Sequence, residues 1–158
     1  MIVALLVGAG IFLVTLVGNA LATWLIVHFL VRLLRIGFTG LGLWQNVAVM
    51  SIVSLLTAMA HLIQIGLWAI ALTLVGAFSS LQTALYCSAQ NYTALGYGDV
   101  TLPERWRMLG PLEAINGLLL FGLSTALMFA ILSRLIKHRL RVSLGQSGLP
   151  ATSASRVR

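Results

Sequence analysis

Three long apolar stretches, separated by short segments with polar residues and glycines, dominate the pattern along the chain. The first covers residues 1–31 without any Lys, Arg, Asp or Glu, the second runs from about 47 to 75, and the third from about 108 to 132. Because about 20 apolar residues cross a bilayer as a helix, each stretch predicts one membrane-spanning helix.

The first stretch has a second interpretation, as a cleaved signal peptide, which the small residues Ala20 and Ala22 favour. However, no basic residue precedes the apolar core, and the apolar run continues past Ala22 to Val31. Signal peptides have a basic start and a shorter apolar core, so we expect a retained helix.

A shorter segment, Phe78 to Tyr92, lies between the second and third spans and is too short to cross the membrane. Ser79 or Ser80 can cap the start of a helix there. The run "NYTALGYGDV", residues 91–100, follows it. Non-helical backbone is tolerated at membrane depth only where it lines a cavity or is buried in protein, so this pattern predicts a re-entrant loop.

Polar residues recur on one face of the second span. Ser54, Thr57, His61 and Gln64 follow one another at steps of three, four and three, so they share a helical face. We expect this face to contact protein rather than lipid. An interhelical hydrogen bond is the preferred role for His61, over a metal site.

Charge and composition agree with a membrane protein. The chain is 59% hydrophobic and 8% charged, whereas about a quarter of a soluble domain is charged. Most of the Lys and Arg residues lie in two groups, at the end of the first span and after the third: Arg32, Arg35, Arg134, Lys137, Arg139, Arg141, Arg156 and Arg158. Three spans and one re-entrant loop bring both groups to one side of the bilayer. The positive-inside rule makes that side cytoplasmic. We therefore expect a multi-pass protein of the cell (inner) membrane, with the N-terminus outside and the C-terminus in the cytoplasm.

Several kinds of protein are excluded by the same counts. The net charge of +7 comes without one long basic patch and interleaved aromatics, so nucleic acid is not an expected partner. The single cysteine, Cys87, excludes an intrachain disulfide. Asp99 is the only aspartate, so the string G-Y-G-D cannot belong to an intramembrane aspartyl protease, which needs two carboxylates.

The glycine spacing after residue 93 has a chemical meaning. A cation stripped of water needs oxygen ligands, and backbone carbonyls supply them if several successive ones face the same way. That arrangement requires left-handed backbone at alternate residues, which Gly96 and Gly98 allow at little cost. Tyr97 between them can point off the axis and brace the loop. One loop cannot surround an ion, so several copies must meet on an axis.

Two motifs here resemble those of a known family. "TALGYGD", Thr93 to Asp99, resembles the potassium-channel signature T-x-V-G-Y-G-D, and "GLLLFGLSTA", Gly117 to Ala126, resembles the inner-helix pattern of simple bacterial potassium channels. The resemblance covers roughly residues 67–139 and leaves the first helix outside. It implies an all-α membrane protein that forms a homotetrameric pore for potassium ions. No cofactor and no enzymatic activity are expected.

The resemblance also implies roles for individual residues, by position. Ion binding in the selectivity filter is assigned to Thr93, Ala94, Leu95, Gly96, Tyr97 and Gly98. Support of the filter is assigned to Asp99, Gln90, Asn91, Tyr86 and Glu113. Gly117 would be the inner-helix hinge, and the cavity and gate would include Phe121, Gly122, Thr125 and Phe129. Glu113 has a second interpretation, as an interfacial cap of the helix that begins after Pro111; in its supporting role it would act through Gln90 or Asn91.

The chain departs from the family pattern at the inner end of the filter. Ala94 stands where the family has a threonine whose hydroxyl forms the innermost ion site, and Leu95 replaces a valine. Gln90 and Cys87 replace an acid and an aromatic residue that usually brace the filter. Two alternatives therefore accompany the potassium-selective channel: a poorly selective monovalent cation channel, and a non-conducting membrane subunit.

The expected organisation has three parts. They are an N-terminal transmembrane helix (1–36), a pore domain (43–141) and a disordered cytoplasmic tail (142–158) rich in Ser and Gly. The pore domain is expected to comprise an outer helix (about 46–76), a pore helix (about 79–93), a filter (94–99) and an inner helix (about 107–138).

Overall fold

The computed structural model describes residues 2–35 and 42–146. This part of the chain is helical and contains no strand. Its elements in chain order are α1 (Ile2–Arg35), α2 (Leu43–Leu74), α3 (Leu81–Tyr92), the 3-10 helix η1 (Glu104–Trp106) and α4 (Leu109–Gln146). Helices α1, α2 and α4 are each long and apolar enough to cross a membrane. The prediction of an all-α fold with three membrane-spanning helices is confirmed.

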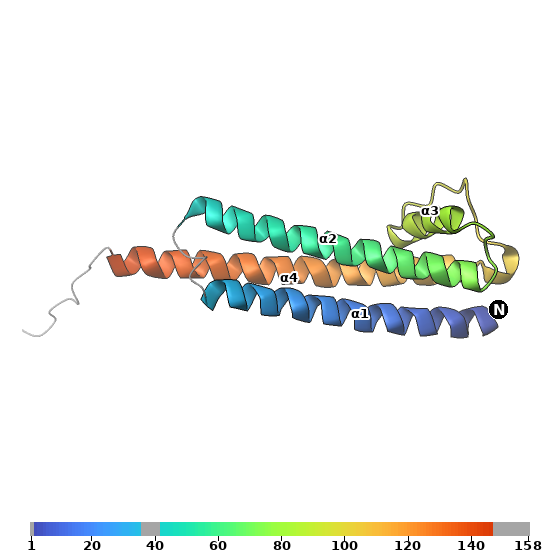
Figure 1. Cartoon of the computed structure of the whole chain (residues 1–158), viewed down its shortest axis with the longest axis horizontal. Coiled ribbons are helices and arrows are strands. Elements are labelled where there is room, and N and C mark those ends of the chain that lie inside the picture. Colours follow the sequence, from blue (N-terminus) through green and yellow to red (C-terminus); the bar gives the residue numbers. More distant parts are fainter. Residues whose placement is uncertain (1, 36–41, 147–158) are drawn as a thin grey trace, which may run out of the picture.

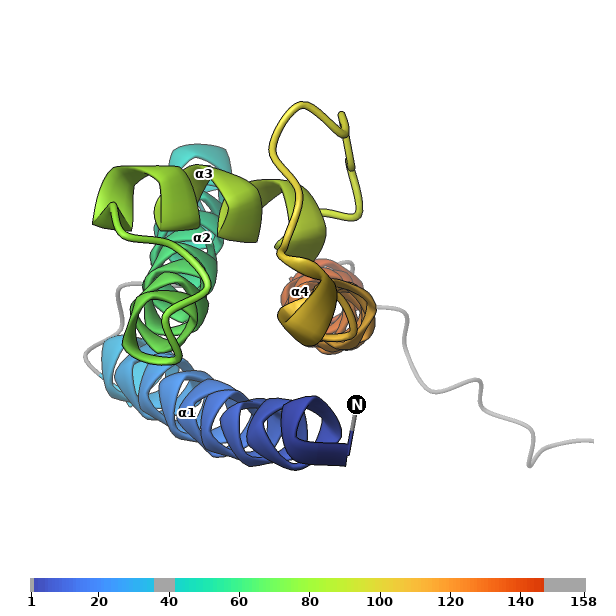
Figure 2. The same cartoon turned by 90° about the vertical axis from the view of Figure 1, so that its right-hand side faces the viewer.

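The three long helices run side by side, and α3 lies at the end of the bundle where the chain begins (Figure 1). An end-on view shows α3 crossing from α2 toward α4, on the face opposite α1 (Figure 2). Helix α1 packs against both α2 and α4. The short helix therefore rests on the two helices that flank it in sequence, and α1 closes the bundle from behind.

Two apolar clusters hold the bundle together, one near each end. The cluster under α3 is built around large, fully buried side chains from α2, α3 and α4, among them Trp68, Leu72, Tyr92, Leu109 and Leu120. The second cluster joins all three long helices far from α3 and comprises Ile26, Leu30, Val49, Val53 and Ile131. It also brings the basic end of α1, with Arg32 and Arg35, beside the described basic segment of α4, residues 134–141, so these basic residues share one end, as predicted. Arg156 and Arg158 lie outside the described part of the chain.

Helix bounds differ from the predicted ones by a few residues, with one larger discrepancy. Helix α4 continues to Gln146, so the prediction of disorder from residue 142 is wrong for 142–146. Once formed, a helix extends by one hydrogen bond per added residue, and no proline occurs between Pro111 in the first turn of α4 and Pro150. Residues 147–158 lie outside the described part of the chain. Ser80 is the N-cap of α3, but its side chain makes no capping hydrogen bond.

Candidate functional site

The loop after α3 has left-handed backbone at alternate residues. The φ angles are 55° at Ala94, 56° at Gly96 and 79° at Gly98. This alternation is the conformation expected from the glycine spacing, and it allows successive carbonyls to face one side. Ala94 extends the pattern by one residue although its Cβ makes this conformation cost about 1–2 kcal/mol. Glycine spacing alone could not reveal that extension.

The side chains around this loop are exposed in the single chain. Residues 93–99 all lie at the surface, with Tyr97 69% and Leu95 55% exposed. Thr93 uses its hydroxyl locally, donating to the Ala89 carbonyl at 2.7 Å in the last turn of α3. The loop is therefore uncovered in the single chain, and it begins at a helix end that is held by hydrogen bonds.

Asp99 ties the far end of the loop back to α3. Its carboxylate accepts a hydrogen bond from the Tyr86 hydroxyl at 2.7 Å and another from Gln90 Nε2 at 2.8 Å. Tyr86 and Gln90 are four residues apart and so lie on the same face of α3. The hydrogen bond from Tyr86, and then that from Gln90, lower the pKa of Asp99 below its ordinary value. The two ends of the loop are thus held at a fixed separation.

Glu113 of α4 holds α3 from the opposite side. Its side chain is fully buried, forms a hydrogen bond with the Ser88 hydroxyl, and accepts a second one from Asn91 Nδ2 at 3.3 Å. The interpretation of Glu113 as an interfacial cap is therefore wrong. Of the two partners predicted for Glu113 in its supporting role, Asn91 forms the hydrogen bond, whereas Gln90 binds Asp99 instead. Ser88 was not among the predicted site residues, although its spacing of three from Asn91 puts both on one face of the helix.

Gly117 lies where α4 touches the end of α3. A Cβ atom at this position would be 1.9 Å from the Tyr92 carbonyl oxygen and 2.8 Å from its carbonyl carbon. Such distances are far below van der Waals contact, so only glycine lets the two backbones come this close. The predicted hinge role of Gly117 stays a prediction; in this structure α4 is a continuous helix through it.

A buried hydrogen-bonded chain surrounds the Tyr92 side chain. The Tyr92 hydroxyl donates to Gln64 Oε1 at 3.1 Å and lies 3.0 Å from His61 Nδ1. His61 Nε2 lies 3.0 Å from the Ser124 hydroxyl, and Gln64 Nε2 donates to Asn19 Oδ1 at 3.3 Å. His61 is therefore an interhelical hydrogen-bonding residue, as predicted.

The polar face of α2 agrees with its prediction at three of four positions. Thr57, His61 and Gln64 are buried against protein. Ser54 is exposed in the single chain, and its hydroxyl donates to the Met50 carbonyl at 2.9 Å, so its contact with protein stays a prediction. A hydroxyl that bonds to its own helix needs no protein partner.

The residues predicted to line a cavity extend along α4. The Phe121 ring packs on His61, with 4.4 Å between ring centroids, and leaves 36% of the side chain exposed. Gly122, Thr125 and Phe129 are exposed, Phe129 to 71%. A continuous exposed strip of α4 therefore begins beside the buried Tyr92 and runs away from α3.

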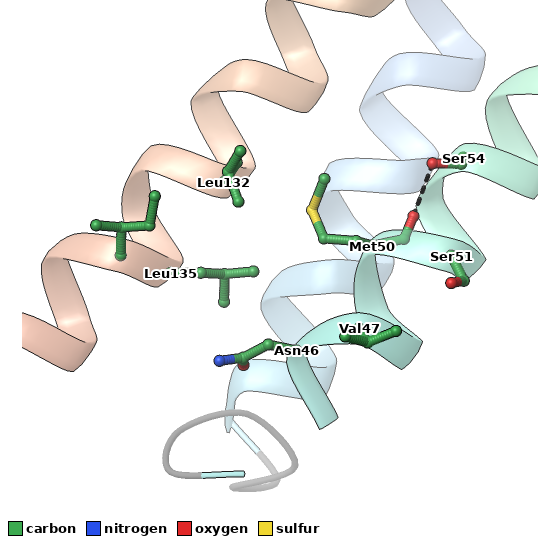
Figure 3. A pocket seen from close by; sticks show the side chains of 8 residues that line it. Asn46, Val47, Met50, Ser51, Ser54, Leu132 and Leu135 are labelled. Atoms are coloured by element: carbon green, nitrogen blue, oxygen red, sulfur yellow. Dashed lines mark hydrogen bonds between the residues drawn. The ribbon is translucent and has the colours of Figure 1, made fainter. Parts of the chain in front are cut away.

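Two hollows border these elements. One, of about 380 Å³, lies between the loop and the start of α4 and is lined in part by Ala94, Gly96, Gly110 and Ala114. The other, of about 620 Å³, lies between the first turns of α2 and residues 132–136 of α4 (Figure 3). Its lining is mostly apolar. Within residues 2–35 and 42–146, no three His, Cys, Asp or Glu residues gather to hold a metal ion.

Comparison with known proteins adds one match. Residues 58–134 match the model of a family described as "Ion channel". No curated protein and no solved structure matched the chain. The matched range contains the second half of α2, all of α3, the loop and the first two thirds of α4, whereas α1 lies outside it. With three helices able to cross a bilayer, the chain is a multi-pass membrane protein, and its residues 58–134 match an ion-channel family whose pore is built from two membrane-spanning helices.

Proposed function

We propose that this protein is a potassium-selective channel in which four copies surround a filter made of residues 93–98. The observation that carries the proposal is the alternating left-handed backbone at Ala94, Gly96 and Gly98. That geometry supports a row of carbonyl oxygens facing one axis, the arrangement that replaces the water around a potassium ion. One copy supplies oxygens from only one side, so a closed ring of copies is required.

The elements then have defined roles in conduction. Helix α2 is the outer helix, α3 the pore helix and α4 the inner helix. The carboxyl end of α3 is at Tyr92, directly before the filter, and a helix carries about half a negative elementary charge at that end. This partial charge lowers the energy of a cation entering the filter. Below it, Phe121, Gly122, Thr125 and Phe129 line the cavity and gate, and Gly117 is the hinge.

Orientation follows from charge. The basic residues at the end of α1 and on α4 lie on the cytoplasmic side of the cell membrane, where Lys and Arg accumulate. The N-terminus and the mouth of the filter then lie outside. Helix α4 has 38 residues, so at about 1.5 Å per residue it extends beyond a hydrocarbon core of roughly 30 Å.

The test is cation flux through the purified full-length protein in liposomes, with the reversal potential measured under bi-ionic potassium and sodium. Potassium preference supports the proposal. Equal permeation would establish a poorly selective cation channel, and absence of flux a non-conducting subunit. A Gly98→Ala variant is the control, because its strain acts on the backbone alone: φ is 79° and a Cβ would meet no atom within 4 Å. It should insert and assemble but lose selective flux.

A further inference from the structure

We propose that α1, the helix outside the family match, supports the filter, and that Asn19 is its positioning residue. The inference rests on the proposed function, since it assigns to α1 a part in holding the filter of that channel. It is carried by the buried hydrogen-bonded chain from Asn19 through Gln64 to Tyr92. Asn19 is 95% buried, so water does not replace a partner lost there.

The direction of every hydrogen bond in this series, from Ser124 to Asn19, can be assigned. A tyrosine hydroxyl has a single proton, and that of Tyr92 is donated to Gln64 Oε1. His61 therefore donates its Nδ1 proton to the Tyr92 oxygen, and its Nε2 accepts from the Ser124 hydroxyl. Gln64 uses its carbonyl toward Tyr92 and its amide toward Asn19. Each link thus sets the orientation of the next, from α4 to α1.

Tyr92 is the residue through which this series of hydrogen bonds reaches the filter. It is the last residue of α3, its side chain is fully buried, and its backbone carbonyl lies against Gly117. The filter begins at the next residue. A change in the position of the Tyr92 ring therefore moves the backbone from which the first filter carbonyls extend. Filter selectivity depends on how firmly such oxygens are held.

A second contact of α1 supplies a matched control. Thr15, one turn before Asn19 and also fully buried, accepts a hydrogen bond from Asn116 of α4. This bond links α1 to the bundle by the same chemistry, a buried carboxamide and a polar side chain of α1. It leads to α4, however, and not to Tyr92. Thr15→Val and Asn19→Leu therefore each leave one buried amide without its α1 partner, and only the second interrupts the path to the filter.

The experiment compares four variants of the full chain in liposomes, with the ratio of potassium to sodium permeability as the readout. Asn19→Leu should lower the ratio roughly fivefold, the effect of one net hydrogen bond of typical strength on an equilibrium. Thr15→Val should leave the ratio unchanged. Tyr92→Phe should lower it at least as much as Asn19→Leu. The double variant Asn19→Leu with Tyr92→Phe should equal Tyr92→Phe alone, because both act along one path.

The inference is overturned if Asn19→Leu behaves like Thr15→Val, or if its effect adds in full to that of Tyr92→Phe. Should Asn19→Leu fail to assemble, Gln64→Met cuts the same path at its centre and replaces it in the comparison. A wild type that conducts both ions equally would refute potassium selectivity alone; total cation flux then becomes the readout for the same variants. A wild type without flux would contradict both proposals.

Discussion

At the scale of single residues, glycine serves two distinct physical purposes in this channel. At Gly96 and Gly98 the backbone is left-handed and no atom lies near a Cβ, so the requirement is conformational. At Gly117 the φ angle is ordinary for a helix, and the requirement is space beside the Tyr92 carbonyl. Both kinds lie within the motifs that resemble potassium channels, and the structure separates them.

Gly117→Ala should destabilise the folded protein, because the added methyl group would overlap the Tyr92 backbone and force α4 away from α3. Overpacking of this kind costs about 1–3 kcal/mol, and more where backbone must move. Thermal unfolding in detergent measures it. Gly122→Ala is the control in the same helix: its Cβ would meet nothing within 4 Å, so the variant should be neutral or stabilised. Equal stability of the two variants would contradict the steric explanation.

Ala94→Thr should raise potassium selectivity. Ala94 offers its carbonyl but no hydroxyl, so the innermost ion site lacks a layer of oxygens, and the number of oxygens around the ion helps to separate potassium from sodium. Its left-handed backbone, with φ 55°, disfavours any β-branched residue. Ala94→Val has the same branching without the hydroxyl and isolates this strain. A reversal potential no more selective for Ala94→Thr than for Ala94→Val would show that the hydroxyl is not limiting.

At the scale of elements, α3 is held by two acidic side chains on different sides. Asp99 anchors the loop to the face with Tyr86 and Gln90, and Glu113 anchors the helix to α4. The Asp99 side chain is exposed, whereas that of Glu113 is buried within a helix able to span the membrane. Channel function should therefore respond differently to removal of the charge at Glu113 and to protonation of Asp99.

Glu113→Gln should keep channel function. Ser88 has one hydroxyl proton and lies within hydrogen-bonding distance of both the Ile65 carbonyl and Glu113. A protonated Glu113 satisfies every group: it donates to Ser88, Ser88 donates to Ile65, and Asn91 donates to Oε2. A glutamine amide reproduces this pattern, whereas Glu113→Leu removes the partner on α4 that Ser88 and Asn91 share. Ion flux and thermal stability check it; a Gln variant as impaired as the Leu variant would show that the negative charge is needed.

Acidifying the outer solution should destabilise the filter loop only at a pH below the ordinary aspartate pKa. Because the pKa of Asp99 is lowered by its hydrogen bonds, the ionised form stabilises the folded loop above the ordinary aspartate pKa of about 3.9. That contribution is lost as pH falls through the lowered pKa. Tyr86→Phe removes the largest cause of the shift, so the loss of selective current should begin at a higher pH. Currents recorded against outer pH test this, and an unchanged profile in Tyr86→Phe would contradict it.

At the scale of the whole molecule, the single chain is incomplete as a channel. The loop, the strip of α4 that includes Phe129 and many apolar side chains of the three long helices are exposed. The outer ones can face lipid, but a row of polar backbone atoms cannot, because hydrocarbon offers no hydrogen-bond partners. In the proposed channel, neighbouring copies cover the loop.

The protein should behave as a complex of four chains in native membranes and in mild detergent, since one filter loop per chain requires four for a closed ring. Native mass measurement counts the copies, and chemical cross-linking in membranes provides the independent check. A stable monomer or dimer in both settings would refute the proposed pore.

Much of this architecture was predictable because it depends on local properties of the chain. The length of each apolar run predicted three spanning helices, and the interval that is too short to cross predicted the position of α3. The spacing of Gly96 and Gly98 predicted the alternating backbone after it. Each of these properties is a matter of nearest neighbours and bilayer thickness, so the order of residues is sufficient to reveal it.

The tertiary structure decided which side chains meet across helices. Glu113 is bound by Ser88 and Asn91 because α4 crosses behind α3 at that level, and Gly117 is required because the two backbones touch there. Asn19 reaches Tyr92 through Gln64 only because α1 packs behind α2 and α4. Such contacts depend on how long helices cross and rotate against one another, which no local pattern of residues specifies.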